Sequence, residues 1–141
     1  MLSWIRQLLS RSSQSNTAII GRRGETEAER SLKCRGYRIV ARNWRSGKDE
    51  IDLVCLDGET VVFVETRTRR SGSLVGGYES IGRRKRDALN RVCRAYLGKL
   101  KPRPKAFRLD VVDVEHEAGQ IIEVRHYENV PLFGKETFRG T

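Results

Sequence analysis

One stretch of the chain, residues 50–70, combines two apolar runs with a strong turn signal between them. The runs Ile51–Leu56 and Val61–Val64 flank Asp57-Gly58, a dipeptide typical of tight β-hairpins. The pattern therefore predicts two antiparallel strands that pair with each other. We interpret the remaining segments by how they fit around this hairpin.

Two acidic residues lie within the hairpin, Asp52 near the start of the first run and Glu65 at the end of the second. A four-residue loop places them directly opposite each other, and a two-residue loop makes them diagonal neighbours on one face, about 5–8 Å apart in either case. Paired carboxylates beside apolar surface are costly unless one holds a proton or a cation such as Mg²⁺ lies between them. Arg67 points to the same face. The alternative is that both acids are solvated at strand ends and that Arg67 pairs with one of them.

Composition and charge indicate the class of partner. The chain has 141 residues, which fits one domain, and its 28 Lys and Arg outnumber 18 Asp and Glu for a net charge of +10. This balance favours a polyanion, chiefly nucleic acid or an anionic membrane surface. Three widely spaced cysteines without a CxxC pattern indicate a reduced compartment, so we expect a cytoplasmic protein. No apolar stretch approaches the roughly 20 residues of a membrane span.

The chain divides into an expected flexible tail over residues 1–20, a domain over 21–133 and a second tail over 134–141. An interfacial helix at Leu2–Leu9, in a basic adaptor that meets membranes, is the alternative for the first tail. Within the domain, periodicity and turn residues predict an order of helix, three strands, helix and two strands. The expected elements outside the hairpin are a helix at Gly24–Arg35, a strand at Tyr37–Trp44, a loop at Thr68–Gly77, a helix at Tyr78–Gly98 and strands at Arg108–Val114 and Ile121–His126.

The first expected helix carries an acidic residue in an unusual place. Its apolar stripe consists of Ala28 and Leu32, and Glu25 lies three and seven residues before them, on the same inward face. The alternative is a first-turn glutamate that complements the helix dipole. Asp110, between Leu109 and Val111, either borders the same site or forms an ion pair with a neighbouring arginine.

The second expected helix is strongly basic. From Glu79 to Lys105 there are ten Lys or Arg and two Asp or Glu, a local charge of +8. A solvated helix face is the simpler explanation, but this excess favours contact with nucleic acid. Lys85 also falls on the apolar face of this helix. The residues expected to contact phosphates are Arg69 and Arg70 in the preceding loop and Arg83, Lys85 and Arg86 in the helix.

Several segments, in order, match a known family. They are Gly24-Glu25 with Ala28, Leu32 and Gly36-Tyr37; Asn43-Trp44-Arg45; Glu50-Ile51-Asp52-Leu53; Val62-Phe63-Val64-Glu65 with Thr68-Arg69; Lys85, Leu89 and Ala95-Tyr96-Leu97; Arg108-Leu109-Asp110-Val111-Val112; and His126 with Asn129. On these residues the chain resembles the YraN-like family of small bacterial proteins. That family is similar to archaeal Holliday junction resolvases and falls in the restriction-endonuclease-like, PD-(D/E)xK superfamily. The resemblance implies an α/β fold with an αβββαβ core and a mixed central sheet flanked by helices.

The resemblance also implies a site and an activity. Asp52 and Glu65 would ligate Mg²⁺ or Mn²⁺, Glu25 would be the helix acid that ligates directly or through water, and the protein would hydrolyse DNA phosphodiester bonds, branched DNA included. Junction resolvases of similar fold are dimers, which implies a homodimer here. Arg67 stands where the family has lysine; it can stabilise charge on a phosphate but cannot accept a proton from water. The alternative function is therefore a catalytically impaired module that binds DNA or RNA.

Overall fold

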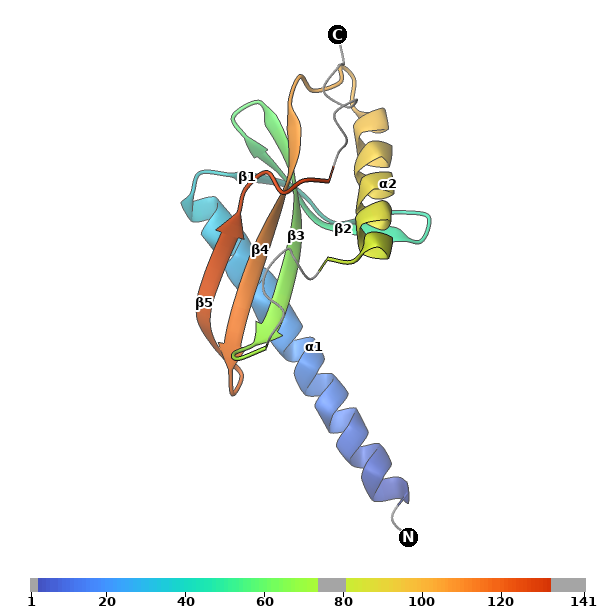
Figure 1. Cartoon of the computed structure of the whole chain (residues 1–141), viewed down its shortest axis with the longest axis vertical. Helices are drawn as coiled ribbons and strands as arrows, with labels where there is room; N and C mark the ends of the chain where they lie inside the picture. Colours follow the sequence, from blue (N-terminus) through green and yellow to red (C-terminus); the bar gives the residue numbers. More distant parts are fainter. Residues whose placement is uncertain (1–2, 74–80, 133–141) are drawn as a thin grey trace.

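The computed structural model describes residues 3–73 and 81–132, with side chains from residue 16 onwards. Two helices and five strands follow one another in the order that the sequence predicts (Figure 1). The elements are α1 (Ser3–Cys34), β1 (Arg38–Ser46), β2 (Asp49–Asp57), β3 (Thr60–Arg70), α2 (Arg83–Lys99), β4 (Phe107–Glu117) and β5 (Gln120–Tyr127).

The strands form one mixed sheet in the order β1-β2-β3-β4-β5. The β3–β4 pair is parallel and the other pairs are antiparallel, as expected when a helix connects β3 to β4. Leu56 pairs with Val61, which confirms the first of the two registers considered for the hairpin. Gly58, in the turn, has φ of 59°, a conformation that glycine adopts without steric cost.

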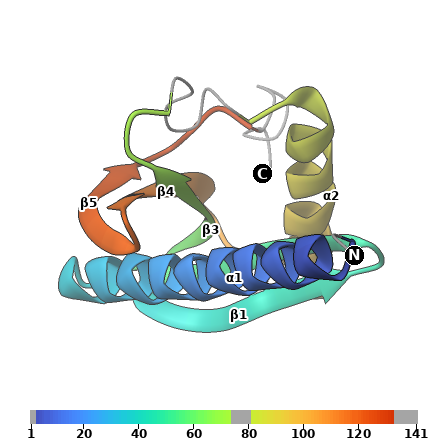
Figure 2. The same cartoon turned by 90° about the horizontal axis from the view of Figure 1, so that it is seen from below.

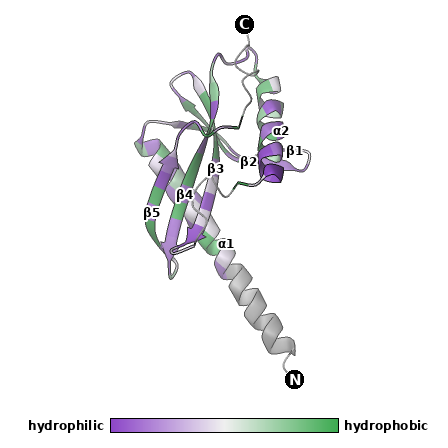
Figure 3. Cartoon of the chain, viewed as in Figure 1, coloured by the Kyte–Doolittle hydropathy of each residue, from purple (hydrophilic) through white to green (hydrophobic). Residues whose placement is uncertain are grey.

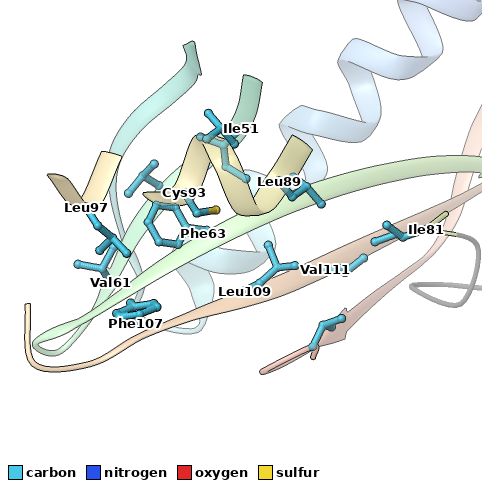
Figure 4. Close-up of a cluster of buried hydrophobic side chains, with 13 residues drawn as sticks. Ile51, Val61, Phe63, Ile81, Leu89, Cys93, Leu97, Phe107, Leu109 and Val111 are labelled. Carbon is cyan, nitrogen blue, oxygen red and sulfur yellow. The ribbon is translucent and has the colours of Figure 1, made fainter. Parts of the chain in front are cut away.

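Each face of the sheet has its own hydrophobic core. On one face, α2 contributes Leu89, Val92, Cys93 and Leu97, which pack with strand residues such as Phe63 (Figure 4). On the other face, Ala28 and Leu32 of α1 pack on the opposite side chains of the central strands. The twisted sheet curves around α1 (Figure 2). Alternation of side chains along β2 and β3 thus supplies two cores, and the predicted mixed sheet flanked by helices is confirmed.

The sheet forks between β2 and β3. Their pairing begins at the turn and ends at Leu53 opposite Val64. Beyond that point β2 stays paired with β1 and β3 stays paired with β4, so the two strands diverge (Figure 1). Asp52 and Glu65 are the first residues past the last pair, and both acids therefore lie at the mouth of the fork.

Three segments differ from the sequence prediction. The first helix begins at Ser3 rather than Gly24, so residues 3–20, expected as a tail, are helical and extend beyond the sheet (Figure 1). Arg69 and Arg70, expected in a loop, belong to β3, because β3 continues its parallel pairing with β4 as far as Arg70. The second helix, expected from Tyr78, begins at Arg83, because Ile81 and Gly82 are not helical. Residues 78–80 and the tail expected over 134–141 lie outside the described residues.

Close packing of α1 on β3 depends on Gly24. A Cβ atom added to Gly24 would lie 2.1 Å from the Thr68 side-chain oxygen, which is closer than any real contact. Glu25 follows directly, so the approach that Gly24 permits also sets the position of Glu25 over the fork. The absence of a side chain at residue 24 is therefore a packing requirement.

We predict that Gly24→Ala destabilises the protein by about 1–3 kcal/mol, because overpacking forces the helix away from β3. Gly21→Ala is the matched control: nothing lies within 4 Å of its added Cβ, and the change should stabilise the helix by about 0.5–1 kcal/mol. Urea denaturation of both variants measures the difference. Equal stability changes in the two variants would contradict the packing role of Gly24.

Candidate functional site

Two neighbouring carboxyl groups mark the fork in the sheet. Glu65 is 6% exposed, and Asp52, the next residue on β2 past the end of the β2–β3 ladder, is half-buried. Asp52 Oδ2 accepts a hydrogen bond from the Thr66 backbone N–H at 2.7 Å. Burial, and next the charge of Asp52, raise the pKa of Glu65 to about 7, and burial also raises the pKa of Asp52. At neutral pH, therefore, the pair tends to keep a proton.

Lys85, in the first turn of α2, is the cation beside this pair. Its Nζ lies 3.2 Å from Glu65 Oε1. Glu65 Oε2 is buried and has no hydrogen-bond partner among the residues that the structure describes. Two carboxylates with one ammonium group leave one negative charge uncompensated when both are ionised. A divalent cation at the unsatisfied oxygen would remove that deficit, so the donor set fits a metal.

A hollow of about 220 Å³ opens beside Asp52 on the α1 face of the sheet. Glu25 lines it together with Asp52, and burial, followed by the charges of Asp52 and Glu50, raises the pKa of Glu25. Glu25 is nevertheless exposed, whereas Gly24, Ala28 and Leu32 form the buried stripe of α1. The prediction that Glu25 lies on the inward face of α1 was therefore wrong. Gly24, one residue earlier, is the buried residue that contacts β3. The other residues that line this hollow are Arg22, Thr26, Glu29, Arg42, Asn43, Leu53 and Thr66.

The predicted three-acid metal cluster is not compact. Within residues 16–73 and 81–132, no three acidic, histidine or cysteine side chains are grouped closely enough to hold a metal ion. Asp52 and Glu65 are neighbours at the fork, and Glu25 lines the smaller hollow together with Asp52. The structure thus brings together two of the three predicted ligands and places the third nearby.

A second hollow, of about 480 Å³, opens on the α2 face. Arg67, Arg69 and Lys85 line it with Glu65, so three cationic side chains share it with one acid. Arg69 binds Asp113 with Nε at 2.9 Å from Oδ2. Arg67 forms no ion pair with any described residue, in contrast to the simple pairing with Asp52 or Glu65 that we considered. The remaining lining residues are Thr66, Thr68, Ser73 and Gly82.

The basic residues predicted on α2 lie on its exposed side. Arg83 and Arg86 are exposed and make no ion pair within the described part of the chain, whereas Arg91 pairs with Asp49. Figure 3 shows the hydrophilic character of the N-terminal turns of α2. Arg70, at the end of β3, is also exposed. Exposed cations therefore lie on both sides of the fork, with Arg83 and Arg86 on α2 and Arg22 beside the smaller hollow.

Asp110 belongs to a separate buried network. Its carboxylate accepts hydrogen bonds from Arg108 Nε at 3.0 Å and the Asn129 backbone N–H at 2.9 Å, and it contacts His126 Nε2 at 2.8 Å. Despite the cost of burial, these donors hold the pKa of Asp110 below its usual value. Of the two interpretations of Asp110, the ion pair with a neighbouring arginine is the one that the structure contains. Sequence reasoning missed the involvement of His126, because the network depends on the pairing of β4 with β5.

The fold and the fork define the chain as a mixed α/β domain with two neighbouring carboxyl groups, each lining one of two hollows. The hollow on the α2 face is basic, and the one on the α1 face carries both acidic and basic side chains. The protein belongs to the uncharacterised protein family UPF0102, whose family profile matches residues 24–114. This confirms the resemblance to YraN-like proteins. The matched region contains Glu25, Asp52, Glu65 and Lys85.

Similar sequences occur across distant bacteria. A UPF0102 protein of Nitratidesulfovibrio vulgaris is 42% identical over 94 residues, which cover 67% of this chain and 70% of that protein. A UPF0102 protein of an Arthrobacter species is 38% identical over 112 residues, or 79% of this chain and 95% of that one. A solved structure of Pyrococcus furiosus SfsA in complex with Ca²⁺ is more distant, at 18% identity and a TM-score of 0.39, covering 79% of this chain and 63% of that one. No helix among the described residues is long and apolar enough to cross a membrane.

We predict that Glu65 makes the metal-free protein less stable as pH rises. The folded-state pKa of about 7 exceeds the ordinary value of 4.5, so between these values the folded protein keeps a proton that the unfolded chain has released. Stability therefore falls as pH rises through this window. Glu65→Gln, a neutral mimic of the protonated side chain, should remove this loss. The melting temperature of the variant relative to wild type should rise from pH 5 to pH 8.

The exposed turn residue Glu59 provides the control. Glu59→Gln should shift the melting curve by the same small amount at every pH, because Glu59 is solvated. Parallel pH profiles for wild type and Glu65→Gln would show that the carboxyl pair does not keep its proton.

Proposed function

We propose that this protein is a metal-dependent nuclease that hydrolyses phosphodiester bonds in DNA. One observation carries the proposal: two carboxyl groups, those of the half-buried Asp52 and the buried Glu65, lie together at the mouth of a forked sheet with the ammonium group of Lys85 beside them. In a sheet with only a structural role, placing these two carboxyl groups together would cost free energy without a benefit. In a site that binds a divalent cation, the same carboxyl groups serve as the ligands.

Asp52 and Glu65 would hold Mg²⁺ or Mn²⁺, and Glu25 lines the same hollow as Asp52 and could add a further carboxylate. When bound, such an ion supplies positive charge that lowers the pKa of water and neutralises charge on a phosphate. The Thr66 N–H fixes the Asp52 carboxylate, and Lys85 fixes that of Glu65. The chain thus orients both ligands before substrate binds.

The two cations near Glu65 have different abilities. Arg67 has no ion-pair partner within the described residues and presents a forked charge suited to phosphate oxygens. Arginine is not a residue type that accepts a proton from water in catalysis, so Arg67 would act through its charge. Lysine is a residue type that serves as a general base in catalytic sites, and Lys85 lies in contact with Glu65. We therefore assign charge stabilisation to Arg67 and proton exchange to Lys85, the lysine function that the family otherwise places in β3.

Exposed cations around the fork would hold the DNA backbone. Arg83 and Arg86 on α2 and Arg70 at the end of β3 are exposed. Such contacts neutralise phosphates and position a strand without reading its sequence. This arrangement favours recognition of backbone shape, as in branched or processed DNA.

We predict that the purified protein cuts DNA in Mg²⁺ or Mn²⁺ and that Asp52→Asn lowers the rate by at least about 100-fold, since the loss of a group that stabilises the transition state typically costs that much. Linear, flapped and four-way DNA should be compared by gel electrophoresis. Glu59→Gln, a carboxyl loss in the exposed hairpin turn, is the matched control and should cut normally. Cutting that persists unchanged in Asp52→Asn would contradict the mechanism.

The variant Arg67→Lys distinguishes an active nuclease from a catalytically impaired module that only binds nucleic acid. If Lys85 supplies the exchangeable proton, Lys85→Met should abolish cutting, and Arg67→Lys should change the rate only modestly. A catalytically impaired module instead predicts no cutting by wild type and a gain of cutting in Arg67→Lys. The second outcome would overturn the proposed activity for the natural chain and leave nucleic-acid binding as its function.

We also predict salt-sensitive DNA binding through α2. Replacement of Arg83 and Arg86 by glutamine should reduce the slope of log affinity against log salt by about 1 for each phosphate that the variant no longer neutralises. Replacement of both Arg35 and Arg38 by glutamine, two exposed changes just beyond the end of α1, is the charge-matched control. Fluorescence anisotropy over a range of salt concentrations measures both slopes, and equal slopes would place the DNA elsewhere.

A further inference from the structure

The two edge strands of the sheet differ in how they are protected against pairing with another strand. Among the described strands, β1 and β5 each have one neighbour. The pairing of β1 with β2 shifts register between Ile39 and Ala41, and three exposed arginines, Arg38, Arg42 and Arg45, lie along β1. Bulges and like charges on an edge strand disfavour pairing between molecules. The β1 edge is therefore protected.

The β5 edge lacks this protection. It contains no proline, and over residues 123–127 its pairing with β4 is regular. The His126 side chain is 1% exposed, yet the residue as a whole is partly exposed, so the accessible part of His126 is its main chain. Figure 1 shows β5 as the outermost strand on its side of the sheet. Its outward N–H and C=O groups can therefore pair with a strand of another molecule.

The charges along β5 are complementary to those of a second, antiparallel copy. Glu123 and Arg125 flank Val124 and share one face of the strand, and their side chains are 51% and 34% exposed. When Val124 lies opposite Val124 of the second copy, Glu123 of each copy lies opposite Arg125 of the other. Two cross-strand pairs of opposite charge then form by symmetry. A register centred on Glu123 or Arg125 places like charges opposite each other instead.

Exposed apolar side chains border the same edge. The large hydrophobic residues that are exposed in the described part of the chain are Ile19, Val40 and Ile122. Ile122 belongs to β5 and is 51% exposed. Ile19 and Ile121 line a hollow of about 610 Å³ between α1 and the start of β5. A second copy beside β5 would cover part of this apolar surface.

We propose that the protein forms a twofold-symmetric dimer in which the β5 strands of two copies pair antiparallel, centred on Val124, and join the two sheets. A symmetric contact of this kind uses the same surface of both copies and is complete at two. The protected β1 edges prevent further growth. Directly opposite residues of a ladder share a face, so the larger hollows of both copies lie on the same side of the dimer.

The proposal is independent of the proposed function, and its test needs neither DNA nor a metal ion. Sedimentation equilibrium of the full-length protein in EDTA should show a dimer at micromolar concentrations. Glu123→Lys places like charges opposite each other at two symmetric positions and should weaken the dimer at least about ten-fold. The variant should fold normally because Glu123 is exposed. Glu59→Lys, the same charge reversal in the exposed β2–β3 turn, is the matched control and should dimerise like wild type.

Disulfide cross-linking tests the register. The background variant is Cys34→Ser, since Cys34 is exposed and the other two cysteines are buried. Val124→Cys places two thiols opposite each other on the symmetry axis, where Cα atoms about 4.5–5.5 Å apart fit a disulfide. Ile122→Cys is the control, because its thiols are offset by four residues, or about 13 Å along the strands. Under mild oxidation, only Val124→Cys should give a covalent dimer on a non-reducing gel.

Two results would overturn the proposal. The first is a wild-type protein that stays monomeric at every concentration up to its solubility limit. The second is a dimer that Glu123→Lys does not weaken, or that cross-links through Val124→Cys no better than through Ile122→Cys. Either form of the second result would place the contact between copies on a surface other than the β5 edge.

Discussion

The contact between Asp52 and Glu65 is the interaction on which the site depends, and the end of the β2–β3 ladder is its cause. Where β2 leaves β3, the N–H of Thr66 has lost a strand partner, and the Asp52 carboxylate accepts its hydrogen bond instead. The same divergence turns Glu65 toward Asp52 in a buried environment. Burial then makes charge on the pair costly, so the fork binds a proton or a cation.

The two helices complete this site from opposite faces of the sheet. On one face, the missing side chain of Gly24 lets α1 approach Thr68 and places Glu25 beside the hollow that Asp52 lines. On the other face, α2 packs through its apolar side and brings Lys85 to Glu65. Each helix thus places one charged residue, Glu25 or Lys85, beside the fork. The packing of the two cores fixes the positions of these residues relative to Asp52 and Glu65.

Local patterns accounted for much of this arrangement. The hairpin and the order of helices and strands followed from periodicity and turn residues, and Leu56 opposite Val61 was one of the two registers considered. The predictions that differed involve long-range contacts. Arg69 was expected in a loop because the sequence around it resembles a turn, but pairing with β4 extends the strand through it. Glu25 was expected on the buried stripe of α1 with Ala28 and Leu32. It is exposed instead, and Gly24 is the buried residue one turn before Ala28 because α1 approaches β3 closely there.

The sequence by itself determined the order of helices and strands, that Asp52 and Glu65 lie on one face of the hairpin, and that the chain suits a polyanionic partner. These properties follow from side-chain period, turn chemistry and net charge, which are local or additive. Only the tertiary structure decided that the ladder stops at those two acids, that Lys85 rather than Arg67 contacts Glu65, and that Asp110 belongs to a separate network with His126. These outcomes depend on how separate elements pack, and no local pattern encodes the distance between side chains from different elements.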